Sequence, residues 1–126
     1  MYFDDLAKVY ELSKKTNCAI FVVPNDVEVK LPHALTLRPD EKTMINVEQV
    51  REVLSKVLTR QLSDQFIVMR PAEKLTEVAA NALLKNLEEP NEKIHYVLVT
   101  ECPSKLLPTV LSRSRLYFLR EGKWWL

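Results

Sequence analysis

The single glycine of this 126-residue chain, Gly122, limits what the chain can bind. A phosphate-binding P-loop needs glycines so that its backbone amides can close around phosphate oxygens, and a dinucleotide-binding turn needs them for the same reason. Gly122 lies near the C-terminal end, after every segment that resembles a strand. The sequence therefore excludes both kinds of nucleotide-binding loop.

Composition narrows the class of protein further. Apolar residues make up 47% of the chain, enough for one packed domain, and the formal net charge of +1 gives no strong basic field for binding nucleic acid through phosphates alone. Two cysteines, Cys18 and Cys102, are too few for a disulfide scaffold or a four-thiolate zinc site. No run approaches the roughly 20 apolar residues of a membrane span, and the acidic N-terminus lacks the basic start of a signal peptide. We expect a soluble, cytoplasmic protein without metal, cofactor or membrane contact.

Short apolar runs alternate with segments of helical periodicity. The strands are predicted at 18–23, 34–37, 65–69, 94–100 and 116–119. The helices are predicted at 3–16, from 47 to about 58, 76–89 and 104–111. This alternation is typical of a three-layer α/β fold with a mainly parallel, five-stranded sheet. Only about ten residues, with no helical pattern, join the first two strands, so the first strand is expected to sit unusually or to pair antiparallel with the second.

Two helix starts carry capping signals. Asn46 and Gln49 have the spacing of a capping box, and Thr76 can cap the helix that Pro90 ends. The inward face of that second helix is predicted to comprise Val78, Ala79, Ala82, Leu83 and Leu87.

The same helix carries the most specific motif in the chain. Residues 74–90, Lys-Leu-Thr-Glu-Val-Ala-Ala-Asn-Ala-Leu-Leu-Lys-Asn-Leu-Glu-Glu-Pro, resemble a signature of clamp-loader subunits in the AAA+ superfamily. Residues 96–100, 105–119 and 45–54 continue the resemblance, which covers about residues 34–119. The ending Ser-Arg-Ser-Arg-Leu-Tyr-Phe-Leu is most similar to the delta-prime family of bacterial DNA polymerase III.

The resemblance implies a fold, a role and partners. It implies an AAA+-like, P-loop NTPase-like sheet that is reduced at the N-terminus, with residues 1–126 forming the first domain and the lid and collar domains absent. It implies a clamp-loader subunit in DNA replication, working with gamma/tau and delta subunits and, indirectly, with the sliding clamp and primer-template DNA.

The departures from the family pattern concern the ATPase site. Where active relatives place Asp-Glu after the third strand to hold magnesium and polarise water, this chain has Arg70 and Pro71. An arginine cannot ligate magnesium, and proline offers no side-chain acceptor. The P-loop with its helix is missing between Val23 and Ala34, and so is the four-cysteine zinc module. A non-catalytic subunit is expected.

The family retains an arginine finger in such subunits, usually within Ser-Arg-Cys. Here the motif is Ser112-Arg113-Ser114, so the resemblance makes Arg113 the residue that reaches a neighbour's ATP. A permanently charged guanidinium suits the charge that develops on a transferred phosphoryl group. Thr100 matches the position called sensor 1 and, without a nucleotide on its own chain, is expected to be vestigial.

Other interpretations stay open. Arg113 and Arg115 can also be ordinary solvated residues. His33 and His95 have no evident catalytic partner in the sequence. Trp124 and Trp125 suit either a partner surface or packing on the first helix. The alternative functions are a divergent ATP-binding AAA+ protein and a DNA-binding adaptor that uses scattered arginines such as Arg51 and Arg60.

Overall fold

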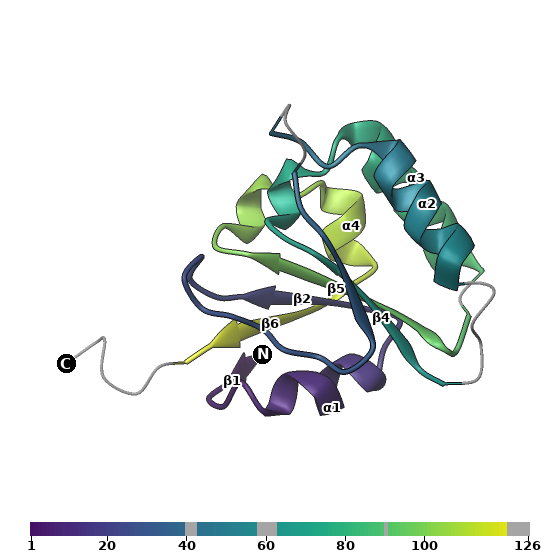
Figure 1. Ribbon diagram of the computed structural model, residues 1–126. Coiled ribbons are helices and arrows are strands. Elements are labelled where there is room, and N and C mark those ends of the chain that lie inside the picture. The colour runs from purple at the N-terminus through teal and green to yellow at the C-terminus, as the bar shows by residue number, and fades with distance from the viewer. Residues whose placement is uncertain (40–42, 58–62, 90, 121–126) are drawn as a thin grey trace.

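A computed structural model describes residues 1–39, 43–57, 63–89 and 91–120. In this part of the chain six strands form one sheet in the order β1-β6-β2-β5-β4-β3, and every pair of neighbours is parallel (Figure 1). The strands are β1 Tyr2–Phe3, β2 Cys18–Val22, β3 Ala34–Leu37, β4 Gln65–Met69, β5 Ile94–Thr100 and β6 Arg115–Leu119. The helices are α1 Lys8–Lys14, α2 Val47–Val57, α3 Glu77–Glu88 and α4 Pro108–Ser112, with 3-10 turns η1 Ala72–Lys74 and η2 Pro103–Lys105.

The predicted three-layer α/β fold with a parallel sheet is confirmed. Helices α2, α3 and α4 cover one face of the sheet, and α1 covers the other (Figure 1). All five predicted strands are present, each within one residue of its predicted bounds. Because side chains alternate along each strand, the sheet has an apolar core on both faces.

The sixth strand, β1, was not predicted, because the helix was expected to begin at Phe3. The Met1 carbonyl accepts a hydrogen bond from the Phe118 amide at 2.8 Å, and the Phe3 carbonyl accepts one from the Arg120 amide at 2.6 Å. The Phe3 ring packs edge-on against Phe21, with 5.5 Å between ring centroids. Pairing and packing thus hold these residues extended, and α1 begins only at Lys8.

The expectation of an antiparallel first pair is wrong. Strand β2 lies in the middle of the sheet, parallel to β5 and β6, whereas β3 lies at the far edge beside β4. The connection between β2 and β3 crosses the face of the sheet as an extended segment instead of a helix (Figure 1). Its residues Val27, Val29 and Leu31 pack on the same core as α1. Alternation with exposed Glu28 and Lys30 lets an extended chain cover this face.

The cap predictions at the starts of two helices are confirmed. The Asn46 amide donates to Gln49 Oε1 at 2.9 Å, and the Gln49 amide donates to Asn46 Oδ1 at 3.0 Å, which completes a reciprocal capping box. Thr76 Oγ1 accepts from the Ala79 amide at 3.1 Å and caps α3.

The inward face predicted for α3 is wrong at Val78, whose side chain is 59% exposed. The fully buried residues of this helix are Ala79, Ala80 and Leu83. The buried stripe includes Ala80 because α3 packs against α2 on one side and α4 on the other. The short helix expected at 104–111 is a 3-10 turn followed by α4, which begins at Pro108, where a missing amide hydrogen costs the helix nothing.

Some predictions fall outside the described residues, namely those on Arg60, Pro90, Gly122, Trp124 and Trp125. None of the helices in the described ranges is both long enough and apolar enough to cross a membrane.

Candidate functional site

Arg70 follows the carboxyl end of β4, at the edge of the sheet where ligands bind in parallel α/β folds. Its Nη2 donates hydrogen bonds to the carbonyl oxygens of Pro24 at 3.1 Å and Asn25 at 2.9 Å. Both acceptors belong to the segment that leaves β2, and the Arg70 residue is 7% exposed. The guanidinium therefore joins the ends of two strands that are not neighbours in the sheet.

The backbone of this segment has the wrong polarity for a phosphate. A phosphate site needs amide N–H groups that point at the ligand. Here Pro24 has no amide hydrogen, and the amide of Asn25 donates to the Glu101 carboxylate. The carbonyls that face inward meet the Arg70 cation instead. The loop after β2 thus binds a positive side chain of its own chain where a P-loop would bind a negative ligand.

The charge of Arg70 is partly desolvated. Burial lowers the pKa of its guanidinium, and the nearby charge of Arg38 acts in the same direction. The carboxylates of Glu28, Asp26 and Glu101 oppose that shift. Because arginine stays protonated in proteins, the side chain remains a cation that needs acceptors. Pro71, the next residue, supplies only its carbonyl, which accepts a hydrogen bond from the Lys74 amide at 3.0 Å.

Thr100 ends β5 at the same edge of the sheet, and its side chain is buried. Its hydroxyl lies 2.8 Å from Glu73 Oε1, to which it donates, and it accepts from the Cys102 amide at 3.0 Å. Both hydrogen-bonding functions of the hydroxyl are therefore used within the chain. Thr100 and Arg70 both lie at the carboxyl ends of the strands, and both side chains are hydrogen-bonded within the chain.

Arg113 lies at the opposite end of the strands from Arg70 and Thr100, on the side of their amino ends. It caps the C-terminus of α4 and precedes the amino end of β6, whereas Arg70 follows the carboxyl end of β4. In an all-parallel sheet these two ends face opposite directions. The Arg113 side chain is 48% exposed, and its Nη2 lies 3.8 Å from the exposed Glu88 Oε1. An exposed pair at this distance restrains the guanidinium weakly.

The residues on either side of Arg113 are held more firmly. Ser112 Oγ donates to the Thr109 carbonyl at 3.0 Å. Ser114 Oγ lies 2.7 Å from the Val110 carbonyl oxygen and 3.0 Å from Cys18 Sγ. Burial raises the pKa of the Cys18 thiol to about 11, so the thiol keeps its proton. The turn that carries Arg113 is thereby attached to helix α4 and to strand β2.

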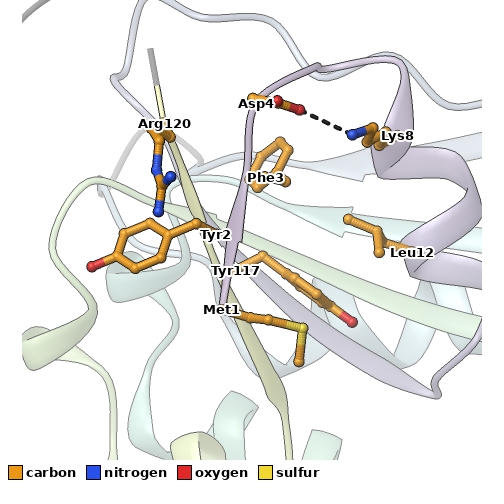
Figure 2. A pocket seen from close by; sticks show the side chains of 8 residues that line it. All are labelled: Met1, Tyr2, Phe3, Asp4, Lys8, Leu12, Tyr117 and Arg120. Atoms are coloured by element: carbon orange, nitrogen blue, oxygen red, sulfur yellow. Dashed lines mark hydrogen bonds and ion pairs between the residues drawn. The ribbon is translucent and has the colours of Figure 1, made fainter. Parts of the chain in front are cut away.

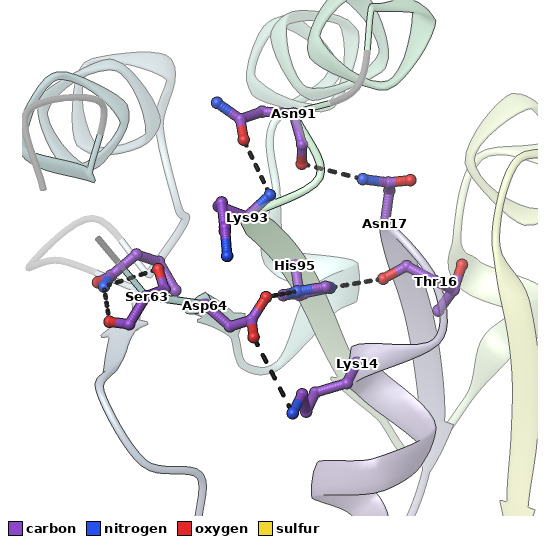
Figure 3. A network of polar contacts seen from close by, with 9 residues as sticks. Lys14, Thr16, Asn17, Ser63, Asp64, Asn91, Lys93 and His95 are labelled. Carbon is purple, nitrogen blue, oxygen red and sulfur yellow. Dashed lines mark hydrogen bonds and ion pairs between the residues drawn. The ribbon is translucent and has the colours of Figure 1, made fainter. Parts of the chain in front are cut away.

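A third polar cluster was missed by the sequence interpretation. His95 on β5 is 4% exposed, with Nδ1 2.8 Å from the Thr16 carbonyl oxygen and Nε2 2.9 Å from Asp64 Oδ1 (Figure 3). Lys14 Nζ lies 4.0 Å from the same carboxylate. The carbonyl can only accept, so Nδ1 donates to it, and Nε2 faces the carboxylate. Asp64 is 31 residues from His95, so no spacing in the sequence indicated the pair.

His95 has no free ring nitrogen for catalysis, and His33 is exposed at a turn with φ of 53°. Within the described ranges no group of three or more His, Cys, Asp or Glu side chains is arranged to hold a metal ion.

The fold defines the class of protein. Its structure is similar to that of a DNA polymerase III gamma subunit-related protein from Thermotoga maritima, with a TM-score of 0.74 over 95% of this chain and 47% of that one, at 23% sequence identity. The chain thus has the α/β fold of this gamma subunit-related protein.

The sequence places the chain in a particular family. Residues 11–122 match the family model described as "DNA polymerase III, delta subunit". The DNA polymerase III subunit delta' of Pseudomonas aeruginosa is 44% identical over 85 residues, covering 65% of this chain, and that of Escherichia coli K12 is 41% identical over 91 residues, covering 70%. The DNA polymerase III subunit tau/gamma of Haemophilus influenzae is 36% identical over 83 residues, covering 64% of this chain and 12% of its own length. The chain belongs to the DNA polymerase III delta' subunit family, as the resemblance implied, and spans about a quarter of the length of the two delta' relatives, 26% and 27%.

Proposed function

We propose that this chain is the first domain of a non-catalytic clamp-loader subunit, which supports loading of the sliding clamp and supplies Arg113 to the ATP site of a neighbouring ATPase subunit. In this proposal the lid and collar domains lie outside residues 1–126. The partners are gamma/tau and delta subunits, with the sliding clamp and primer-template DNA as indirect partners, in the cytoplasm.

The observation that carries the proposal is that Arg113 lies at the opposite end of the strands from the chain's own strand-end site, which is the group formed by Arg70 and Thr100 at the carboxyl ends of β4 and β5. Arg113 is half-exposed at the amino end of the strands, and within the described part of the chain its ion pair is the 3.8 Å contact with the exposed carboxylate of Glu88. A guanidinium placed there cannot serve a ligand at the carboxyl edge of the same sheet, but it is free to enter the site of an adjacent molecule. Such an arginine stabilises charge on the transferred phosphoryl group.

The internal contacts of Arg70 and Thr100 support the non-catalytic half of the proposal. Arg70 occupies the carbonyls of Pro24 and Asn25, and the hydroxyl of Thr100 is used by Glu73 and Cys102. Among the described residues no group of three or more His, Cys, Asp or Glu side chains is arranged to hold a metal ion, and the Asn25 amide is taken up by Glu101. Arg70 and Pro71 then form a degenerate magnesium site, and Thr100 is a vestigial sensor. These contacts disfavour the alternative of a divergent ATPase.

The test is the ATPase rate of purified gamma/tau with and without this chain. We expect the chain to increase the rate at saturating concentration and Arg113→Ala to remove that increment. Arg115→Ala is the matched control, because Arg115 is an exposed arginine two residues away on β6. No increment from the wild-type chain, or equal increments from the wild-type and Arg113→Ala chains, would contradict the proposal.

A further inference from the structure

A pocket of about 360 Å³ lies where β1, α1 and β6 meet, and neither Arg70 nor Arg113 lines it (Figure 2). Its volume is at the lower end of the range for ligand pockets in proteins. The walls are lined by Met1, Tyr2, Phe3, Asp4, Lys8, Leu12, Tyr117 and Arg120. This lining combines aromatic and aliphatic surface with a few charged groups, which is the composition of a binding site.

Tyr117 gives the pocket an unpartnered polar group. The residue is 2% exposed, and its ring stacks on Phe21 with 5.3 Å between centroids. A buried tyrosine hydroxyl ordinarily has a hydrogen-bond partner. Among the contacts of the described residues none involves the Tyr117 hydroxyl, and it is not among the fully enclosed polar atoms that lack a partner. The hydroxyl is therefore not fully enclosed, and it belongs to a residue that lines the pocket.

The charged groups of the pocket favour an anion. Lys8 Nζ lies 3.0 Å from Asp4 Oδ1, so these two charges balance each other. The Arg120 guanidinium lies over the Tyr2 ring, with Cζ 4.7 Å from its centroid, and among the charged side chains of the pocket it has no lining carboxylate left to balance it (Figure 2). A carboxylate beside an apolar group would meet both Arg120 and the aromatic walls.

The surroundings favour a protein partner over a small molecule. Four large hydrophobic residues are exposed in the described part of the chain, and three of them, Met1, Tyr2 and Leu6, lie at this corner. They extend the apolar surface beyond the pocket itself, as at a protein interface. Strand β1 also ends the sheet order, so its outer edge pairs with no other described strand. An extended peptide can contact such an edge.

We propose that this corner is a docking site for a peptide segment of a partner protein, in which an aromatic side chain enters the pocket and an adjacent carboxylate binds Arg120. The aromatic side chain packs on Phe3 and Leu12, and Tyr117 supplies a hydrogen bond at the wall. The docking site does not include Arg113. A negative result for peptide docking is therefore separate from a negative result for the proposed function.

The test uses the whole chain and three acetylated, amidated tripeptides: Asp-Trp-Asp, Lys-Trp-Lys and Asp-Ala-Asp. Amide resonances of the isotope-labelled chain are followed as each peptide is added to millimolar concentration. We expect Asp-Trp-Asp alone to shift the resonances of Tyr2, Lys8 and Tyr117. Arg120→Gln and Tyr117→Phe should each weaken binding by about three- to tenfold, the effect of losing one hydrogen bond or ion pair. Lys85→Gln, at an exposed lysine on α3, should leave it unchanged.

Several results would overturn the inference. They are equal binding of Lys-Trp-Lys, shifts confined to another surface, or no shift with any peptide. If Trp124→Ala and Trp125→Ala move the same resonances without peptide, the chain's own C-terminal residues are the occupant and the inference is wrong. Arg120→Gln changes an exposed side chain, so it keeps the test decisive if Tyr117→Phe disturbs the core.

Discussion

Arg70 Nη2 lies 2.9 Å from the carbonyl oxygen of Asn25, and this contact joins the carboxyl end of β4 to the segment that leaves β2. The same nitrogen lies 3.1 Å from the Pro24 carbonyl. One cationic side chain thus satisfies two backbone acceptors at the edge where an active relative would bind a nucleotide. We expect these contacts to stabilise the fold.

The first prediction concerns the stability that Arg70 contributes. Arg70→Met keeps most of the aliphatic stem but leaves the carbonyls of Pro24 and Asn25 without the guanidinium. We expect the free energy of unfolding in urea to fall by about 1.5–3 kcal/mol, the typical value for a hydrogen bond to a charged group. Arg38→Met, at an exposed arginine nearby, is the control and should change it by less than about 0.5 kcal/mol. Equal effects of the two substitutions would show that the Arg70 contacts contribute nothing.

The second prediction concerns the extended connection that covers the sheet in place of a helix. Val29 is half-buried against the core shared with α1, whereas its neighbour Lys30 is exposed. Val29→Ser should lower the free energy of unfolding by about 1 kcal/mol, since a fully buried valine is worth about 1.5–3 kcal/mol. Lys30→Ser should have little effect. If both variants unfold at the wild-type urea concentration, the connection does not pack as described.

The third prediction is a pH dependence that arises from Asp64. Its hydrogen bond with His95 lowers the pKa of the carboxyl below the ordinary value of 3.8, with the charges of His95, Lys93 and Lys14 acting in the same direction. Since the folded-state pKa is the lower one, the carboxylate stabilises the fold above pH 3.8, and that stabilisation is lost as pH falls through the folded value.

Urea unfolding of the wild type and Asp64→Asn between pH 6 and pH 3 measures this effect. The free energy of unfolding of the wild type should exceed that of Asp64→Asn by a constant amount above about pH 5, and this excess should shrink below about pH 4. Because Asp64 is 31% exposed, solvent screening keeps the effect modest. Glu92→Gln, at an exposed carboxylate, should follow the wild type throughout. A difference that grows as the pH falls would have the wrong sign for a lowered pKa.

The fourth prediction separates the two cysteines by reactivity. Cys18 is buried beside Ser114, and burial raises the pKa of its thiol to about 11, whereas Cys102 is partly exposed. Because the thiolate is the reactive form, one thiol per chain should react with Ellman's reagent at pH 8 in the native state and two in urea. Cys102→Ser should remove the native reaction. Rapid reaction of Cys18 in the folded chain would place it outside the core.

The pattern of the sequence predicted the sheet well because its central strands are continuous apolar runs. β5, from Ile94 to Thr100, is buried at every position, so its strand signal does not depend on distant contacts. β1 has only two residues, too few for any periodicity, and its pairing with β6 decides its conformation. Val27, Val29 and Leu31 do alternate, but Pro24 and Pro32 bound the segment, and prolines at both ends are typical of a loop.

The candidate site was predictable only in part. The motif around Arg113 and the replacement at Arg70 and Pro71 were visible from the resemblance. The contacts of Arg70 with Pro24 and Asn25 span 46 and 45 residues, and the pair of His95 with Asp64 spans 31. Such contacts arise from the order of parallel strands, which brings distant loops to one edge, and local sequence carries no signal for them.

The fifth and most direct measurement is a calorimetric titration of the chain with magnesium-ATP, with purified gamma/tau as the positive control. The central claim is that the strand-end site binds its own chain in place of a nucleotide. We expect no saturable heat up to millimolar ATP, and none after the double substitution Arg70→Asp and Pro71→Glu, because Pro24 still has no amide hydrogen and the Asn25 amide still donates to Glu101. A micromolar dissociation constant for the wild-type chain would contradict the claim.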